Sequence, residues 1–185
     1  MKVLKNYING KFVDSKSGRF IEFMNPALDE PLGKIPMSTR EEVESAVKAA
    51  HDAYLEWRKV PGIQRIQPLF RLLNLIKENI DEIAESIVIN HGKEWNAAVG
   101  EVIRAYQMIE SSFTVPEYQK GQYMSNIATG IDEYSILEPL GVYIMIPPFN
   151  FPAMIPFWFW PFAVATGNTY IIKSNEQTPL ALTYL

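Results

Sequence analysis

Residues 139–179 read PLGVYIMIPPFNFPAMIPFWFWPFAVATGNTYIIKSNEQTP, and no charged side chain occurs between Pro139 and Ile172. An uncharged run of this length would suffice to cross a bilayer, for which about 20 apolar residues are needed. Residues that break or end helices interrupt it, namely Pro147, Pro148, Pro152, Pro156, Pro161 and Gly167. These interruptions favour several short buried elements over one membrane-spanning helix.

The first two of these elements are a strand and a helix. Val142–Ile146 is apolar, rich in β-branched and aromatic residues, and bounded by glycine and proline, which predicts a strand buried on both faces. Asn150 is followed two residues later by proline, which is a helix-start signal. We therefore expect a helix over residues 152–166, kinked near Pro161, where a backbone donor is missing.

A second strand completes the unit. Gly167-Asn168 predicts a left-handed cap at the end of the helix. Thr169–Ile172 follows at once and has the composition of a strand. A strand, a helix and a second strand at such close spacing are typical of a βαβ unit with parallel strands.

Polar residues follow both predicted strands. Asn150 comes soon after the first strand, and Lys173-Ser-Asn-Glu176 comes directly after the second. In an open parallel sheet, ligands bind beyond the carboxyl ends of the strands, so these residues are expected to share one binding edge. In the simpler interpretation, Asn150 only caps the helix and Lys173 is only a solvated strand end.

The same segment resembles the aldehyde dehydrogenase superfamily. Five motifs match that superfamily in order and spacing: Pro148-Phe-Asn-Phe-Pro152, Gly167-Asn-Thr169, Lys173, Glu176 and Thr178-Pro179. Leu140-Gly-Val and the aromatic helix are most similar to its methylmalonate-semialdehyde branch. The resemblance runs the whole length of this chain and corresponds to the N-terminal part of the family's longer chain. It implies an α/β fold, the beginning of a Rossmann-type NAD-binding domain.

The resemblance also implies a chemistry. In the family, a cysteine attacks the aldehyde, hydrogen-bond donors hold the resulting oxyanion, hydride passes to NAD, and the acyl thioester is released to water or coenzyme A. Asn150 matches the position whose amide stabilises the oxyanion. Arg104 is similar to an arginine that contacts the substrate's carboxylate. The implied cofactor contacts are Ile146, Pro147, Pro148, Phe149, Lys173 and Glu176, of which the last two match positions at the adenosine ribose.

Two departures and one alternative qualify the match. Ser174-Asn175 stands where the family usually continues with proline, which leaves the choice between NAD and NADP open. Helical spacing alone pairs Arg104 with Glu101 in an exposed ion pair, the simpler interpretation of that arginine. The nucleophilic cysteine, the catalytic glutamate and the glycine-bearing pyrophosphate segment are absent. The chain alone is therefore expected to be inactive and to need the remainder of an aldehyde dehydrogenase chain.

We expect one incomplete NAD-binding domain over residues 1–185, without the catalytic domain. Its predicted regions are N-terminal strands (1–37), helices (38–117), an oligomerisation arm (118–138) and the start of the βαβ unit (139–185). The first region includes a hairpin at Asn9-Gly10 and a small antiparallel layer. Thr39 and Glu42 form a capping box that opens the first helix. An exposed strand over residues 132–138, similar to the arm through which the family's subunits associate, predicts a homo-oligomer.

Composition narrows the remaining possibilities. A net charge of −4 and a pI near 5.3 give no attraction to nucleic acid or anionic membranes. The chain has no cysteine, which excludes disulfides and thiolate chemistry within it. His51 has no partners at metal-ligand spacing, and His91 is expected only to favour the negative end of a helix, so no metal site is predicted. No signal-peptide pattern opens the chain, which predicts a cytoplasmic protein.

The last residues predict that more chain belongs to this fold. Thr178-Pro179 should begin a helix, and Leu185 falls inside it. Two strands with one aromatic helix would expose a large apolar surface, so we expect a truncated chain, a split gene or partial coordinates. Two other functions stay open: a non-catalytic module that pairs through residues 132–138 with a longer relative, and a membrane anchor, which the prolines disfavour.

Overall fold

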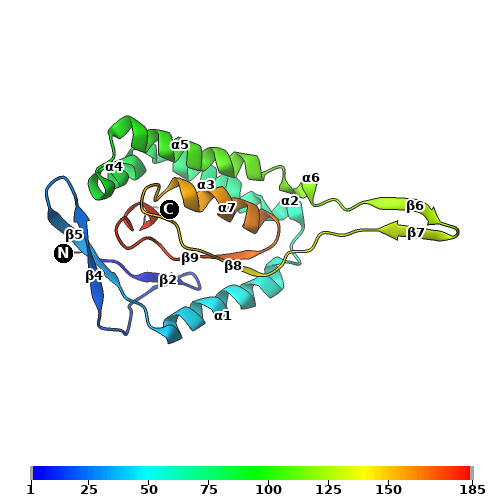
Figure 1. The fold of residues 1–185 in the computed structure, drawn as a ribbon, viewed down its shortest axis with the longest axis horizontal. Coiled ribbons are helices and arrows are strands. Elements are labelled where there is room, and N and C mark those ends of the chain that lie inside the picture. Colours follow the sequence, from blue (N-terminus) through cyan, green and yellow to red (C-terminus); the bar gives the residue numbers. More distant parts are fainter. Residues whose placement is uncertain (1, 184–185) are drawn as a thin grey trace.

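The computed structural model describes residues 2–183 and has a mixed α/β architecture, which confirms the predicted fold class (Figure 1). The strands are β1 (Lys2–Val3), β2 (Asn6–Ile8), β3 (Lys11–Val13), β4 (Phe20–Asn25), β5 (Glu30–Pro36), β6 (Tyr123–Ala128), β7 (Ile131–Tyr134), β8 (Val142–Met145) and β9 (Thr169–Ile172). The helices are α1 (Arg40–Trp57), α2 (Gly62–Arg65), α3 (Gln67–Glu78), α4 (Ile80–His91), α5 (Trp95–Ser112), α6 (Val115–Tyr118) and α7 (Met154–Ala165), with a 3₁₀ turn at Ala181–Thr183.

The β8–α7–β9 unit confirms the predicted parallel βαβ motif. β8 and β9 pair in parallel, with Val142 opposite Thr169 and Met145 opposite Ile172. Gly167 has a φ of 96°, and the amide of Asn168 bonds to the carbonyl of Ala163 at 2.9 Å, as in a left-handed helix cap. The glycine therefore ends α7 and turns the chain directly into β9.

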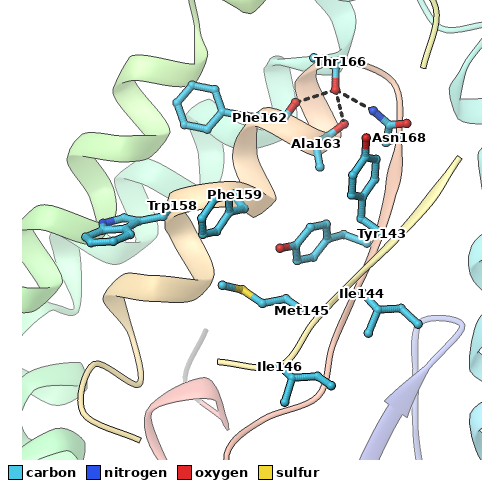
Figure 2. Close-up of a pocket in the computed structure, with 11 residues that line it drawn as sticks. Tyr143, Ile144, Met145, Ile146, Trp158, Phe159, Phe162, Ala163, Thr166 and Asn168 are labelled. Carbon is cyan, nitrogen blue, oxygen red and sulfur yellow. Dashed lines mark hydrogen bonds between the residues drawn. The ribbon is translucent and has the colours of Figure 1, made fainter. Parts of the chain in front are cut away.

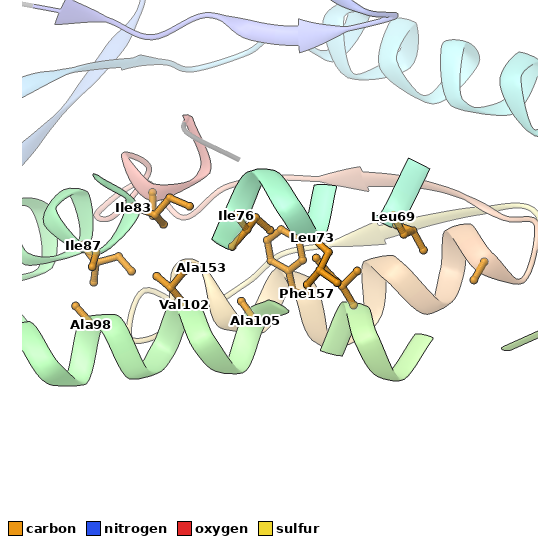
Figure 3. Packing of buried hydrophobic residues seen from close by; sticks show 14 of the residues in the cluster. Leu69, Leu73, Ile76, Ile83, Ile87, Ala98, Val102, Ala105, Ala153 and Phe157 are labelled. Atoms are coloured by element: carbon orange, nitrogen blue, oxygen red, sulfur yellow. The ribbon is translucent and has the colours of Figure 1, made fainter. Parts of the chain in front are cut away.

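Helices cover the β8–β9 pair on two sides (Figure 1). On one side lies α1, where the Thr169 hydroxyl donates to the carbonyl of Ala50 at 2.8 Å. On the other side α7 packs between the strands and a group formed by α3, α4 and α5. Figure 3 shows the core of this group, in which the ring of Phe157 lies among side chains of three helices; its members include Leu69, Leu73, Ile76, Ile83, Ile87, Ala98, Val102, Ala105 and Ala153.

Strand β8 is not buried on both faces, contrary to prediction. Tyr143 and Ile144 are 39% and 55% exposed. The sheet that contains β8 has only two strands among the described residues, so neither face is fully covered. Contacts within the chain therefore bury the apolar side chains of this strand only in part.

Arg65 at the end of α2 is buried and ties together several backbone segments. Its guanidinium donates to the carbonyls of Val60 at 2.7 Å, Arg58 at 3.1 Å and Ala165 at 3.4 Å. It also packs against Gly167, where an added Cβ would lie 2.6 Å from the guanidinium. One side chain thus fixes the end of α7 against the turn that follows α1.

The N-terminal region contains the predicted hairpin and two unpredicted strands, β1 and β5. Asn9 and Gly10, with φ values of 52° and 74°, form the two-residue turn between β2 and β3. The predicted antiparallel layer is wrong in part, because β1 pairs with β5 in parallel while β4 pairs with β5 in antiparallel. Strand β5 was missed because Pro31, Gly33 and Pro36 weaken its strand pattern.

The capping box at the start of α1 is confirmed. The amide of Glu42 donates to the Thr39 hydroxyl at 3.3 Å, and the amide of Thr39 donates to the Glu42 carboxylate at 2.8 Å. The same carboxylate accepts a bond from the amide of Lys16 at 2.7 Å, so it also holds the preceding loop. These backbone hydrogen bonds lower the pKa of Glu42.

Replacing Thr39 with alanine should lower the free energy of unfolding by about 1 kcal/mol, because one helix amide loses its partner. Urea titration followed by circular dichroism measures the effect. Thr129→Ala, in an exposed turn, is the matched control and should change little. Equal stability of the two variants would contradict the capping role.

The predicted arm is a two-stranded hairpin that projects away from the rest of the chain (Figure 1). Strands β6 and β7 pair in antiparallel, and β7 ends at Tyr134, not at Glu138 as predicted. Strand β6 was not foreseen. The side chains of both strands are exposed, including Tyr123, Ile127 and Tyr134.

The helix predicted from Thr178 is also wrong within the described residues. A 3₁₀ turn occupies Ala181–Thr183, and residues 184–185 lie outside the described part of the chain. Thr178 is buried, and its hydroxyl donates to the carbonyl of Phe149 at 3.1 Å. The threonine therefore ties two loops together and caps no helix.

Candidate functional site

The loops that follow β8 and β9 meet at one edge of the sheet, as the parallel topology predicts. The amide of Lys173 donates to the carbonyl of Met145 at 2.9 Å, which continues the ladder to the ends of both strands. The bond from Thr178 to Phe149 then joins the two loops. The candidate residues on both loops thus share the edge at which open parallel sheets bind ligands.

Lys173 and Glu176 form an ion pair on the second of these loops. Their Nζ and Oε2 atoms lie 2.7 Å apart, and the side chains are 54% and 46% exposed. The lysine's hydrogen bond lowers the pKa of Glu176, so the carboxylate stays ionised at neutral pH. An ammonium beside a carboxylate offers both donors and acceptors to a pair of hydroxyl groups.

The first loop carries the other predicted cofactor residues in contrasting environments. Pro147 is fully buried, whereas Ile146 is 71% exposed and Pro148 and Phe149 are exposed. The ring of Phe149 is stacked near His91, with ring centroids 6.2 Å apart. The buried proline anchors the loop, and its neighbours present apolar surface at the edge.

Asn150 does not cap α7, contrary to the helix-start prediction. The N-cap position belongs to Ala153, which has no side chain able to cap. Asn150 is exposed, and its backbone carbonyl accepts a bond from Lys93 at 2.8 Å. Within residues 2–183 its side-chain amide has no hydrogen-bond partner, which leaves it available to a ligand.

Glu101 and Lys93 are the site-supporting residues that sequence reasoning missed. Glu101 is buried on α5, pairs with Lys93, and accepts bonds from the amides of Ala153 at 2.8 Å and Met154 at 3.1 Å. The simpler interpretation of Arg104, an exposed ion pair with Glu101, is therefore wrong. A signal was present, because Glu101 falls on the apolar stripe of α5 (Ala98, Val102, Ala105), where an unpaired charge would be costly.

Arg104 is exposed on α5. Its Nη1 atom donates to Gln107 at 3.1 Å, one turn further along the same helix. None of its described hydrogen bonds reaches the loop at Asn150. The structure thus leaves the guanidinium free to turn toward a ligand, but it does not bring Arg104 and Asn150 into contact.

His91 is not placed to favour the end of α4 as a cation. Both ring nitrogens are buried, and neither has a hydrogen-bond partner among the described residues. Burial is the main cause that lowers the pKa of His91, and the nearby Lys93 lowers it further, while Glu101 opposes the shift. The imidazole is therefore neutral near pH 7.

This lowered pKa predicts a loss of stability in mild acid. Because the unfolded chain binds the His91 proton more readily, the free energy of unfolding should fall as pH drops below about 6.5 and should be unaffected by His91 above it. Urea titrations of wild type and His91→Phe between pH 5 and 8 measure the difference in slope. A wild-type slope in His91→Phe would refute the prediction.

A hollow of about 580 Å³ lies between α7 and the β8–β9 pair (Figure 2). Its lining includes Tyr143, Met145, Trp158, Phe159 and Tyr170, and no charged side chain contributes to it. Thr166 satisfies its hydroxyl within the chain, donating to the carbonyls of Phe162 at 2.8 Å and Ala163 at 2.9 Å. Its apolar lining suits packing better than polar chemistry.

Two classes of site find no support in the described residues. No cluster of three or more histidine, aspartate or glutamate side chains within residues 2–183 could hold a metal ion. Over the same range, every helix is too short or too polar to traverse a lipid bilayer.

The chain is similar to known proteins over almost its whole length. The family model described as "Aldehyde dehydrogenase family" matches residues 12–185. The chain is 45% identical over 179 residues to malonate-semialdehyde dehydrogenase 2 of Geobacillus thermodenitrificans, covering 97% of this chain and 37% of that protein. It is 44% identical to a probable methylmalonate-semialdehyde/malonate-semialdehyde dehydrogenase of Dictyostelium discoideum, covering 98% of this chain and 34% of the relative.

Solved structures give the same result. A methylmalonate-semialdehyde dehydrogenase of Oceanimonas doudoroffii superposes with a TM-score of 0.95 at 35% identity, over 100% of this chain and 38% of that one. A putative methylmalonate-semialdehyde dehydrogenase of Sinorhizobium meliloti, complexed with NAD, gives 0.93 at 32% identity, over 100% and 39%. The chain thus spans between a third and two fifths of these proteins' length, and it belongs to the aldehyde dehydrogenase family.

Proposed function

We propose that this chain is the N-terminal portion of an NAD-dependent enzyme that oxidises malonate or methylmalonate semialdehyde. The observation that carries the proposal is the side-chain amide of Asn150, which has no hydrogen-bond partner within residues 2–183 and is held on the β8 loop beside the loop of Lys173 and Glu176. The names of the relatives support this substrate class. The catalytic thiolate must come from outside residues 1–185, since these contain no cysteine.

Each residue has a distinct part in the proposed reaction. The Asn150 amide donates a hydrogen bond to the oxyanion that forms when the aldehyde carbon is attacked, a role in which one preorganised donor is worth about 3 kcal/mol. Lys173 and Glu176 bind the ribose hydroxyls of the cofactor, and the residues from Ile146 to Phe149 line its path. When bound, NAD supplies the hydride acceptor.

The residues present fit such a cofactor. The Lys173–Glu176 pair is half-exposed at the strand ends, where a hydroxyl-bearing ligand can replace solvent around both groups. We choose NAD over NADP because the Sinorhizobium meliloti neighbour is complexed with NAD. A second neighbour, 3,6-anhydro-L-galactose dehydrogenase, was solved in complex with NAP. We propose coenzyme A as the acyl acceptor, because the name of the Dictyostelium discoideum relative includes the word acylating.

We also propose that the β6–β7 hairpin, with its exposed apolar side chains, is the arm through which copies of the complete protein associate. In this proposal residues 1–185 form one incomplete NAD-binding domain, divided at about residues 37, 117 and 138. Sedimentation of the complete protein with and without residues 121–136 tests the arm. Loss of the oligomer on deletion supports it, and an unchanged oligomer contradicts it.

The test of the proposed function uses a chimera in which residues 1–185 replace the matching part of the Geobacillus thermodenitrificans relative. The chimera should form NADH from malonate semialdehyde, whereas the isolated chain should form none. A folded chimera that binds NAD but oxidises neither semialdehyde would overturn the proposed substrate. Rapid NADH formation by the isolated chain would overturn the assignment of the thiolate to another segment.

Arg104→Ala in the chimera should lower kcat/KM for malonate semialdehyde by roughly 10- to 100-fold, because the substrate carboxylate loses a charged hydrogen-bond donor. Propionaldehyde, which lacks the carboxylate, should lose less than about two-fold. Arg71→Ala, an exposed arginine on α3, is the control. Equal losses on both aldehydes would show that Arg104 does not recognise the carboxylate.

A further inference from the structure

Glu101 is a carboxylate in the interior of the molecule. Its side chain is 0% exposed, a position that is unfavourable unless every lone pair has a partner. Its Oε1 atom accepts bonds from the amides of Ala153 and Met154, at 2.8 and 3.1 Å, and its Oε2 atom accepts one from Lys93. The two amides belong to the segment that joins Asn150 to α7, and Lys93 also donates to the carbonyl of Asn150 in that segment.

Lys93 completes this arrangement from the other side. Its side chain is only 11% exposed, and Nζ donates to the carbonyl of Asn150 at 2.8 Å. The same ammonium lies 4.2 Å from the centre of the Phe151 ring. One buried ion pair therefore contacts four of the five residues from 150 to 154.

The backbone of α7 explains why an external carboxylate is needed. Helix amides in the first turn have no partner within the helix, and Ala153 at the N-cap has no side-chain acceptor. Glu101, from α5, supplies that acceptor and a negative charge at the positive end of the helix. Gly92, with a φ of 77°, ends α4 and turns the chain so that Lys93 reaches its place.

We infer that Lys93 and Glu101 are positioning residues, which hold the backbone of residues 150–154 so that the side-chain amide of Asn150 stays directed into the site. This inference rests on the oxyanion role proposed for Asn150. Lys93 and Glu101 touch no reacting atom themselves. They act by restricting a segment that carries Asn150 at one end and the first turn of α7 at the other.

The first test measures hydrogen exchange in the 185-residue chain. Glu101→Gln and Lys93→Met should speed exchange of the Ala153 and Met154 amides by roughly ten-fold or more, because a charged acceptor or its counter-ion is lost. The control is Lys77→Met. Lys77 lies on α3, pairs with Glu110 of α5 at 2.7 Å and lies 4.8 Å from the Tyr106 ring, and none of its described hydrogen bonds or ion pairs reaches residues 150–154.

The second test measures kinetics in the chimera. Lys93→Met should lower kcat by roughly 10-fold while KM for NAD changes less than about two-fold, since the Lys173 loop is untouched. Lys93→Arg should restore part of kcat, because a guanidinium can still reach a carbonyl and a carboxylate. A merely structural role would lower the amount of folded protein and leave kcat per folded site unchanged.

The outcomes separate this inference from the proposed function. If Asn150→Ala leaves kcat unchanged, the oxyanion role is wrong. If Asn150→Ala lowers kcat but Lys93→Met behaves as Lys77→Met in both tests, the oxyanion role stands and the positioning role is wrong. Should Glu101→Gln fail to fold, the two Lys93 variants decide, because Glu101 itself is unchanged in them.

Discussion

Asn150→Ala in the chimera is expected to lower kcat by roughly 100- to 1,000-fold, the largest effect of any single substitution at this site. In the proposed reaction the amide donates to charge that exists only in the transition state, so kcat should fall much more than the affinity for substrate. Steady-state NADH formation with malonate semialdehyde gives both constants. The circular dichroism spectrum of the variant should match that of the unaltered chimera.

Two further variants sharpen this prediction. Asn150→Gln keeps the amide but moves it by one methylene, and it should lose most of the activity because donor position matters. Asn74→Ala, at an exposed position on α3, should behave as wild type. Wild-type kcat in Asn150→Ala would remove the residue from the proposed mechanism and leave cofactor binding as the role of this edge.

Arg65→Met is expected to lower the free energy of unfolding by about 3 kcal/mol, because several carbonyls around the buried guanidinium lose their donor at once. Urea titration of the 185-residue chain measures this loss. Arg71→Met, on the exposed surface of α3, removes the same charge and should change stability by less than about 0.5 kcal/mol. Similar stability of the two variants would show that water replaces the guanidinium without cost.

The βαβ unit could be predicted because its signals are local. Gly167 needs a positive φ, and Thr169–Ile172 follows it without an intervening loop, so the cap and the second strand were both foreseen. The position of Lys173 at the sheet edge followed from topology alone. The same reasoning failed at Asn150, since a helix-start signal cannot show that a distant carboxylate already serves the helix amides.

The missed residues act over long sequence separations. Glu101 lies 52 residues before Ala153, Lys93 lies 57 before Asn150, and Arg65 lies 100 before Ala165. Helical periodicity marks which face of α5 is buried, but it does not say which amides that face will meet. Only the packing of α5 against α7 decides that Glu101 has partners at all.

The contact between Thr169 and Ala50 also bears on how the chain folds during synthesis. The two residues are 119 positions apart, and Trp57 of α1 reaches 107 positions forward to the carbonyl of Val164. At about 5 to 20 residues per second, α1 leaves the ribosome roughly 6 to 24 seconds before the strand on which it packs. Throughout that interval the face of α1 that carries Ala50 and Trp57 has nothing to pack on, so a nascent-chain chaperone can bind it.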